Sequence, residues 1–291
     1  LTGTTALTFA KEPGFDYVIT AEPAEFALKG RKVRGQGFDG TFPAPVLRAK
    51  QGQRFRVKLV NKLKKETTIH WHGVRLDNKM DGVPFLTQPP IKPGESFVYD
   101  FIPPDAGTFW YHPHIHSVEQ LSQGLSGMLI VEEAKPVSFD QDHIVQIKNW
   151  NVDAKGQVEN LFSMKKAARC GTMGRELTVN GDKELVVKAR PGETLRLRFA
   201  NLDVSSIYKI AGLKEVGAKI LAVDSNPMAK PFTPDHWELG PGMRIDVGVQ
   251  FQPSPAGKTI RHGTGAKQAP LVRFVQEKGK AKTRQPAANL T

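Results

Sequence analysis

Short runs of alternating apolar and polar residues, separated by turn-forming residues, recur along this chain of 291 residues. In residues 49–61 and 189–201, apolar side chains alternate with basic ones, which is the period of two expected of a β-strand with one buried face. The chain's 27 Gly and 21 Pro are spread between such runs and supply the turns. The pattern predicts an all-β protein built from short strands in β-sandwiches.

The second half of the chain repeats the strand plan of the first. The segment AKQGQRFRVKLVN at 49–61 returns as ARPGETLRLRFAN at 189–201. Further on, KPGESFV at 92–98 is echoed by GPGMRID at 240–246. A repeat of this order predicts two tandem domains of one design, which also fits the chain length.

We therefore expect one domain over residues 1–135 and a second over 136–277. Residues 278–291 carry Lys and Arg but no apolar periodicity, so they are expected to form a basic linker or tail.

Two pairs of histidines carry the chemistry of the first half. His70 and His72 flank Trp71, and His112 and His114 are spaced in the same way. In a strand, side chains two apart point to one face, so each pair projects together. Two such pairs on neighbouring strands bring four imidazoles to one place, and imidazoles without Cys suit copper or zinc better than magnesium or calcium. The alternative, a solvated strand face, fits a single pair better than it fits two.

The same part of the chain contains six short motifs in order: HWHG at 70–73, DG at 81–82, TQPPI at 87–91, PGES at 93–96, GTFWYHPH at 107–114 and GLSG at 124–127. Together they resemble the first cupredoxin domain of the multicopper oxidases, the family of laccases, cuprous oxidases and copper-resistance oxidases. The resemblance covers nearly the whole of that domain. It implies two tandem cupredoxin-like Greek-key β-sandwich domains.

The resemblance also implies a role for each histidine of the two pairs. His70 would bind the type 2 copper of a trinuclear cluster, and His72, His112 and His114 would bind the type 3 pair. Asp81 would be a catalytic carboxylate beside the cluster, orienting a ligand or relaying protons to reduced oxygen.

Two further residues of this region leave alternatives open. Asp81 could instead be an ordinary turn aspartate before Gly82. His116 falls on the same strand face by its spacing, but the resemblance gives it no ligand role, so we interpret it as a polar residue that lines the site.

The second half has no comparable histidine pair. Residues 202–212, which correspond to the first pair, contain no histidine, and His262 stands alone where the second pair would be. His143 and His236 are isolated too. We expect the second domain to hold no copper.

The ligands of a type 1 copper, a thiolate with two imidazoles, are also missing. The one cysteine, Cys170, lies in a glycine-rich stretch without a nearby histidine, and we interpret it as a free thiol. Pro113 stands where copper nitrite reductases have their cysteine, so this chain is neither a nitrite reductase nor a complete two-domain laccase. A third cupredoxin domain or another chain would have to complete the cluster, as in a cleaved or truncated oxidase, or in a paralogue that borrows the other half.

The resemblance thus implies the copper-binding portion of a multicopper oxidase, which couples one-electron oxidation of a reducing substrate to the reduction of dioxygen to water. The substrate would be a phenolic compound or a metal ion, and the chain alone is expected to be inactive. The alternative is a copper-free or copper-poor scaffold protein of multicopper-oxidase type. Retention of four histidines argues against it, because packing alone does not favour four imidazoles at one place.

Charge and hydropathy change this picture little. The formal net charge of +12 is scattered and accompanies no nucleic-acid motif, so we expect no nucleic-acid partner. No run of 18 apolar residues is present, which predicts no membrane span. A start at Leu1 is consistent with a removed secretion signal or with trimming of the sequence, and the family resemblance favours a periplasmic or secreted protein.

Overall fold

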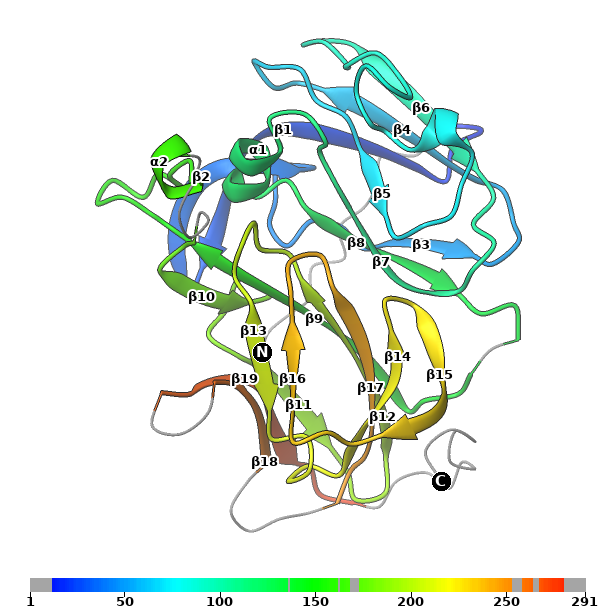
Figure 1. The fold of residues 1–291 in the computed structure, drawn as a ribbon, viewed down its shortest axis with the longest axis vertical. Coiled ribbons are helices and arrows are strands. Elements are labelled where there is room, and N and C mark those ends of the chain that lie inside the picture. Colours follow the sequence, from blue (N-terminus) through cyan, green and yellow to red (C-terminus); the bar gives the residue numbers. More distant parts are fainter. Residues whose placement is uncertain are drawn as a thin grey trace. The chain divides into compact units, whose positions relative to one another are not determined.

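The computed structural model describes residues 12–135, 137–161, 163–167, 173–252, 258–263 and 267–279. In this part of the chain, strands predominate, with two short α-helices and one 3-10 helix between them, so the predicted all-β class is confirmed (Figure 1). No helix among these residues is long and apolar enough to cross a bilayer. Cys170 and most of the basic tail lie outside the described residues.

The chain divides into two compact units. The first contains the residues up to Phe26, then Lys32–Ala134 and Gly156–Val158, and the second contains Ala27–Arg31, Lys135–Lys155 and the residues from Glu159 onward. This division differs from a single cut near residue 135 by the exchange of two short segments.

The first unit is built mainly from eight strands, one α-helix and one 3-10 helix, coloured blue to green in Figure 1. Their bounds are β1 (Tyr17–Leu28), β2 (Arg31–Phe38), β3 (Leu47–Lys50), β4 (Phe55–Asn61), β5 (His70–His72), η1 (Asn78–Met80), β6 (Ser96–Phe101), β7 (Gly107–His112), α1 (Ser117–Gln123) and β8 (Gly127–Glu132).

These strands form two sheets, with the orders β2-β1-β4-β6 and β3-β8-β7-β5. Alternate residues of both sheets meet in one hydrophobic core, in which Trp71, Tyr99 and Tyr111 are fully buried. The first unit is therefore a two-layer sandwich, and the strands with the histidines lie in its second sheet.

The second unit contains eleven strands and one short helix among the described residues. Their bounds are β9 (Gln141–Trp150), α2 (Met164–Ala167), β10 (Glu176–Val179), β11 (Leu185–Ala189), β12 (Thr194–Asn201), β13 (Tyr208–Ala211), β14 (Ala218–Val223), β15 (Asn226–Phe232), β16 (His236–Leu239), β17 (Arg244–Gln250), β18 (Lys258–His262) and β19 (Ala269–Gln276). The sheet orders are β10-β9-β12-β17-β14-β15 and β11-β19-β18-β13-β16.

The two units share one pairing scheme. In the first, β1 runs parallel to β4 and β4 antiparallel to β6, and in the second, β9 runs parallel to β12 and β12 antiparallel to β17. The other sheets match as well, because β3 pairs in parallel with β8 as β11 does with β19. The repeat in the sequence is therefore a repeat of strand pairing.

A buried asparagine ends the central strand of the first unit. The side-chain amide of Asn61 donates to the carbonyls of Lys65 and Ile91 at 2.9 and 2.8 Å, and its Oδ1 accepts from the N–H of Leu63 at 2.9 Å. The side chain thus ties the end of β4 to two loops that precede and follow β5.

Asn201 does the same at the end of β12. Its amide donates to the carbonyls of Ser206 and Leu239 at 2.8 and 2.9 Å, and its Oδ1 accepts from the N–H of Asp203 at 2.9 Å. We call the two equivalent residues, Asn61 and Asn201, the asparagine clamps. They explain why Asn closes both copies of the repeated segment.

Removing a clamp is expected to destabilise its own unit. Asn61→Ala or Asn201→Ala should lower the free energy of unfolding by ~2–4 kcal/mol, because three hydrogen bonds are lost and buried carbonyls are left without donors. Urea denaturation followed by circular dichroism measures this change. Asn226→Ala, at an exposed position in β15, should cost less than ~1 kcal/mol, and equal effects at all three positions would contradict the clamp interpretation.

Candidate metal centre

Strands β5 and β7 place the histidines by their register. The two strands pair antiparallel, with His70 opposite His112, Trp71 opposite Tyr111 and His72 opposite Trp110. Trp71 and Tyr111 belong to the hydrophobic core. Because side chains alternate between faces, the three histidines stand together on the other face of the sheet.

Two contacts fix the start of β5. The N–H of Ile69 donates to the hydroxyl of Tyr99 at 2.7 Å, and burial of that hydroxyl raises the pKa of Tyr99 above its ordinary value. Gly82, with a φ of 75°, lies so close to the carbonyl of Ile69 that a Cβ would collide with it. Only glycine fits this approach, and it brings the adjoining Asp81 against His70.

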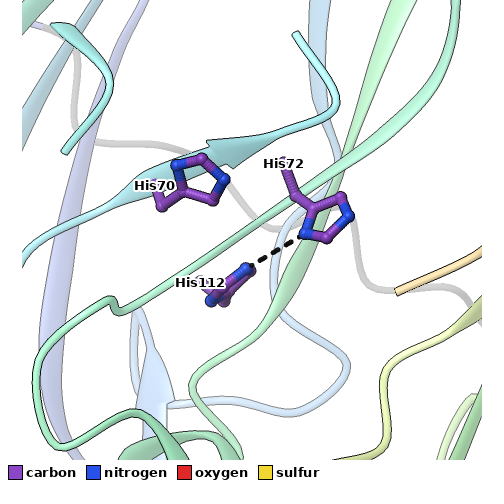
Figure 2. A group of neighbouring side chains, drawn as sticks. All are labelled: His70, His72 and His112. Atoms are coloured by element: carbon purple, nitrogen blue, oxygen red, sulfur yellow. Dashed lines mark hydrogen bonds between the residues drawn. The ribbon is translucent and has the colours of Figure 1, made fainter. Parts of the chain in front are cut away.

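The imidazoles of His70, His72 and His112 converge, as Figure 2 shows. One nitrogen from each ring lies within 4.8 Å of the others. The ring centroid of His70 is 5.8 Å from that of His72 and 5.4 Å from that of His112, and the last two are 5.6 Å apart. Among the described residues, these three histidines form a group whose ring nitrogens are close enough to hold one metal ion.

Backbone carbonyls determine which ring nitrogens can bind a metal. Nδ1 of His70 lies 2.8 Å from the carbonyl of Asp81, and Nδ1 of His112 lies 2.9 Å from that of Pro113. A carbonyl only accepts, so both Nδ1 atoms carry the proton and both Nε2 atoms present a lone pair. Nε2 of His112 faces Nδ1 of His72 at 3.4 Å, the contact dashed in Figure 2.

This spacing fits metal coordination. Two nitrogens bound to one ion at ~2.0 Å and a tetrahedral angle lie ~3.3 Å apart, close to the 3.4 Å between His72 and His112. The donors are neutral imidazoles without a neighbouring thiolate, a set suited to copper or zinc.

His114 and His116 lie outside the strand that their spacing predicts, because β7 ends at His112. The N–H of His114 donates to Thr68 Oγ1 at 3.2 Å, and its ring lies beside the cluster, 5.3 Å from the His70 ring and 6.4 Å from the His112 ring. His116 is the N-cap of α1, with a left-handed φ of 48°. The predicted strand position of His116 was therefore wrong, because the chain turns into a helix after Pro113.

The cluster disfavours protonation of its members. Burial, and then the charges of the other three histidines, lower the pKa of His112 well below its ordinary value of 6.5. Partial burial and then the charge of His70 also lower the pKa of His114. At neutral pH both rings are therefore uncharged, which is the form that binds a metal.

Asp81 contacts His70 in two ways. Its carbonyl accepts at 2.8 Å, whereas its carboxylate oxygen lies 3.3 Å from the same Nδ1. The carboxylate predicted from the sequence is thus beside the site, but the backbone of the same residue is the nearer partner. No residue pattern in the sequence indicates this carbonyl contact.

Trp110 is a neighbour of the site that the histidine spacing alone does not single out. Its ring stacks on His112 at 4.1 Å between centroids and lies 4.8 Å from His72. The sequence does indicate this neighbour, because Trp110 lies two residues before His112 and so shares the histidine face of a strand.

The corresponding place in the second unit is filled differently. There β13 pairs with β18, and the ring of His262 packs against Tyr208 at 5.3 Å and accepts from the N–H of Lys209 at 3.1 Å. His143 lies 2.8 Å from Gln141, and His236 is exposed. The expectations that this unit holds no copper and that Cys170 is a free thiol stay predictions.

Comparisons with family models and with solved structures find proteins similar to this chain. Two family models, both described as multicopper oxidase, match residues 20–136 and 141–270. Crystal structures of multicopper oxidases from Pseudomonas thermotolerans and Pseudomonas parafulva are 37% and 39% identical to the chain, with TM-scores of 0.83 and 0.81. Each alignment covers 94% of this chain, and 66% and 67% of the two structures. The expected cupredoxin-like fold is confirmed by these neighbours.

Curated relatives are longer. Copper resistance protein A of Escherichia coli is 28% identical over 82% of this chain and 46% of its own length. Multicopper oxidase mco of Staphylococcus aureus is 34% identical over 64% of this chain and 42% of its own length. The chain therefore spans less than half the length of these two relatives.

The lowered pKa of His112 predicts acid sensitivity of the metal-free chain. Below about pH 6.5 the unfolded state gains a proton that folded His112 does not accept, so the free energy of unfolding should fall with decreasing pH, by up to ~1 kcal/mol per pH unit. His112→Gln should make this dependence shallower between pH 7 and 5. His116→Asn, a change of an exposed histidine in the same unit, is the control, and equal slopes in His112→Gln and wild type would contradict the prediction. Urea titrations in chelator-treated buffer measure the slopes.

Proposed function

This chain belongs to the multicopper oxidase family of copper-dependent oxidoreductases, and we propose that its first unit supplies half of a trinuclear copper cluster. The observation that carries the proposal is the convergence of the two histidine pairs, with ring nitrogens of His72 and His112 facing each other at 3.4 Å. Bound copper would supply the one-electron chemistry that reduces dioxygen to water.

Each histidine has a separate place in the proposed site. His72 and His112 would bind one copper ion of the type 3 pair, and His114 would bind the other ion of that pair. His70 would bind the type 2 copper through Nε2, because its Nδ1 is engaged by the carbonyl of Asp81.

Asp81 would act on the site through His70 and through solvent. Its carbonyl fixes the tautomer and ring plane of His70, a role that outer partners of metal-bound histidines commonly have. Its half-buried carboxylate, 3.3 Å from the same ring, would hold and pass on the protons that oxygen reduction consumes. This second role defines Asp81 as the catalytic residue of the proposal.

The remaining parts of the reaction would come from beyond this chain's site. A third cupredoxin domain or another chain would supply the other imidazoles and the type 1 copper. The reducing substrate, a phenolic compound or a metal ion, would bind near that copper. We place the protein in the periplasm or outside the cell, as its resemblance to copper-resistance oxidases favours.

Copper titration of the purified chain tests the proposal against the copper-free scaffold. The chain should bind copper, and His72→Ala should weaken binding by at least ~100-fold, because a ligand is lost rather than an outer partner. His236→Ala removes an exposed histidine of the second unit and should leave the affinity unchanged. Calorimetry with a competing chelator measures it, and a chain that takes up no copper would support the scaffold.

Asp81→Asn should lower copper affinity less than His72→Ala does. The backbone carbonyl still orients His70 in this variant, so a loss of ~10-fold or less is expected. Asp77→Asn, at the exposed N-cap of η1, is the matched control. A loss as large as that of His72→Ala would mean that the Asp81 carboxylate is itself a ligand.

The copper-loaded chain should show no intense blue absorption and no oxidation of phenolic dyes. A type 1 centre needs a cysteine thiolate with two imidazoles, and the sequence offers no histidine near Cys170. Visible spectra and dye assays of the loaded chain test this expectation. A blue band that disappears in Cys170→Ser would contradict it.

A further inference from the structure

We propose that Trp110 is a positioning residue of the metal site, whose indole holds His72 and His112 as a pair aimed at one copper ion. The inference rests on the proposed function and adds to it a residue that contacts the ligands rather than the metal. It follows from where the indole is buried and what it touches.

Trp110 is buried without belonging to the hydrophobic core. Only 3% of its surface is exposed, yet it is absent from the core that contains its strand neighbours Phe109 and Tyr111. Alternation along β7 places those two neighbours toward the core and Trp110 toward the histidine face. Core packing therefore does not account for a buried tryptophan at this position.

Ring contacts with two imidazoles, one stacked and one tilted, do account for it. The indole lies 4.1 Å from the His112 ring at an interplanar angle of 28°, and 4.8 Å from the His72 ring at 32°. His112 is its neighbour two positions along β7, and His72 is its partner across the ladder. The two imidazoles that one indole contacts are the same two whose nitrogens face each other at 3.4 Å.

The contact is made by the ring face and not by the polar group. Nε1 of Trp110 is buried and has no hydrogen-bond partner among the described residues. A buried N–H without an acceptor is unfavourable, so the position is not explained by hydrogen bonding. The large flat surface of the indole is what two adjacent imidazoles can share.

Stacking of this kind would favour copper binding in two ways. It limits the side-chain rotations of both histidines before the metal arrives, so less freedom is lost on binding. It also places an electron-rich face against imidazoles that become electron-poor when they bind a cation, as in cation–π contacts. Both effects act on affinity and ligand geometry rather than on the fold.

The test compares three variants of the full 291-residue chain by copper affinity and by the electron paramagnetic resonance spectrum of bound Cu(II). Trp110→Leu removes the aromatic face, and we expect a ~10–100-fold loss of affinity with broadened Cu(II) lines, the loss typical when an outer partner is removed. Trp110→Phe keeps an aromatic face and should restore most of the affinity, to within ~5-fold of wild type. Phe109→Leu, in the same strand but facing the core, should lower the melting temperature and leave affinity and spectrum unchanged.

The outcomes separate this inference from the proposed function. Copper binding in wild type with unchanged affinity and spectrum in Trp110→Leu would overturn the role of Trp110 alone. Equal losses in Trp110→Leu and Phe109→Leu would overturn it as well, since the effect would then be one of stability. If Trp110→Leu does not fold, Trp110→Met carries the same comparison. Absence of copper binding in wild type would instead overturn the proposed function.

Discussion

Three residue pairs between β5 and β7 set the positions of His70, His72, His112 and Trp110 at the metal site. With His70 opposite His112 and His72 opposite Trp110, one face of this ladder presents imidazoles and an indole, and the other presents Trp71 and Tyr111 to the core. A slip of the register by one residue would turn the histidines toward the core and the aromatic side chains outward. The packing of the core thus maintains the metal site, although no core residue is a proposed ligand.

Burial and backbone carbonyls together set the protonation state of the histidines at the site. Clustering four imidazoles beside a buried strand lowers the pKa of His112 and keeps its ring neutral, while the carbonyls of Asp81 and Pro113 hold the protons on Nδ1. The Nε2 atoms of His70 and His112 are therefore left with free lone pairs.

Much of this arrangement follows from sequence. The all-β class, the repeat of strand pairing and the grouping of His70, His72 and His112 all derive from periods of two and from recurring segments, which local sequence encodes directly. The chain's course after His112 was not accessible in this way, because Pro113 ends the strand and sets His114 and His116 on different local paths.

Other features depend on contacts between distant segments. The carbonyl contact of Asp81 arises from the close approach of Gly82 to Ile69, and side-chain identity carries no information about a carbonyl's direction. The ring contact between Trp110 and His72 requires the register of two strands that lie far apart in the chain. The assignment of individual copper ions to these residues remains a prediction.

The asparagine clamps have a consequence for how such proteins can diverge. Asn61 and Asn201 secure equivalent strand ends through hydrogen bonds that involve no residue of the histidine face. After a duplication, one copy could therefore exchange its imidazoles for other residues without losing its architecture. The residues that stabilise the sandwich and the residues that bind metal can therefore change independently. A metal site can be gained or lost by substitutions on one sheet face while the fold is kept.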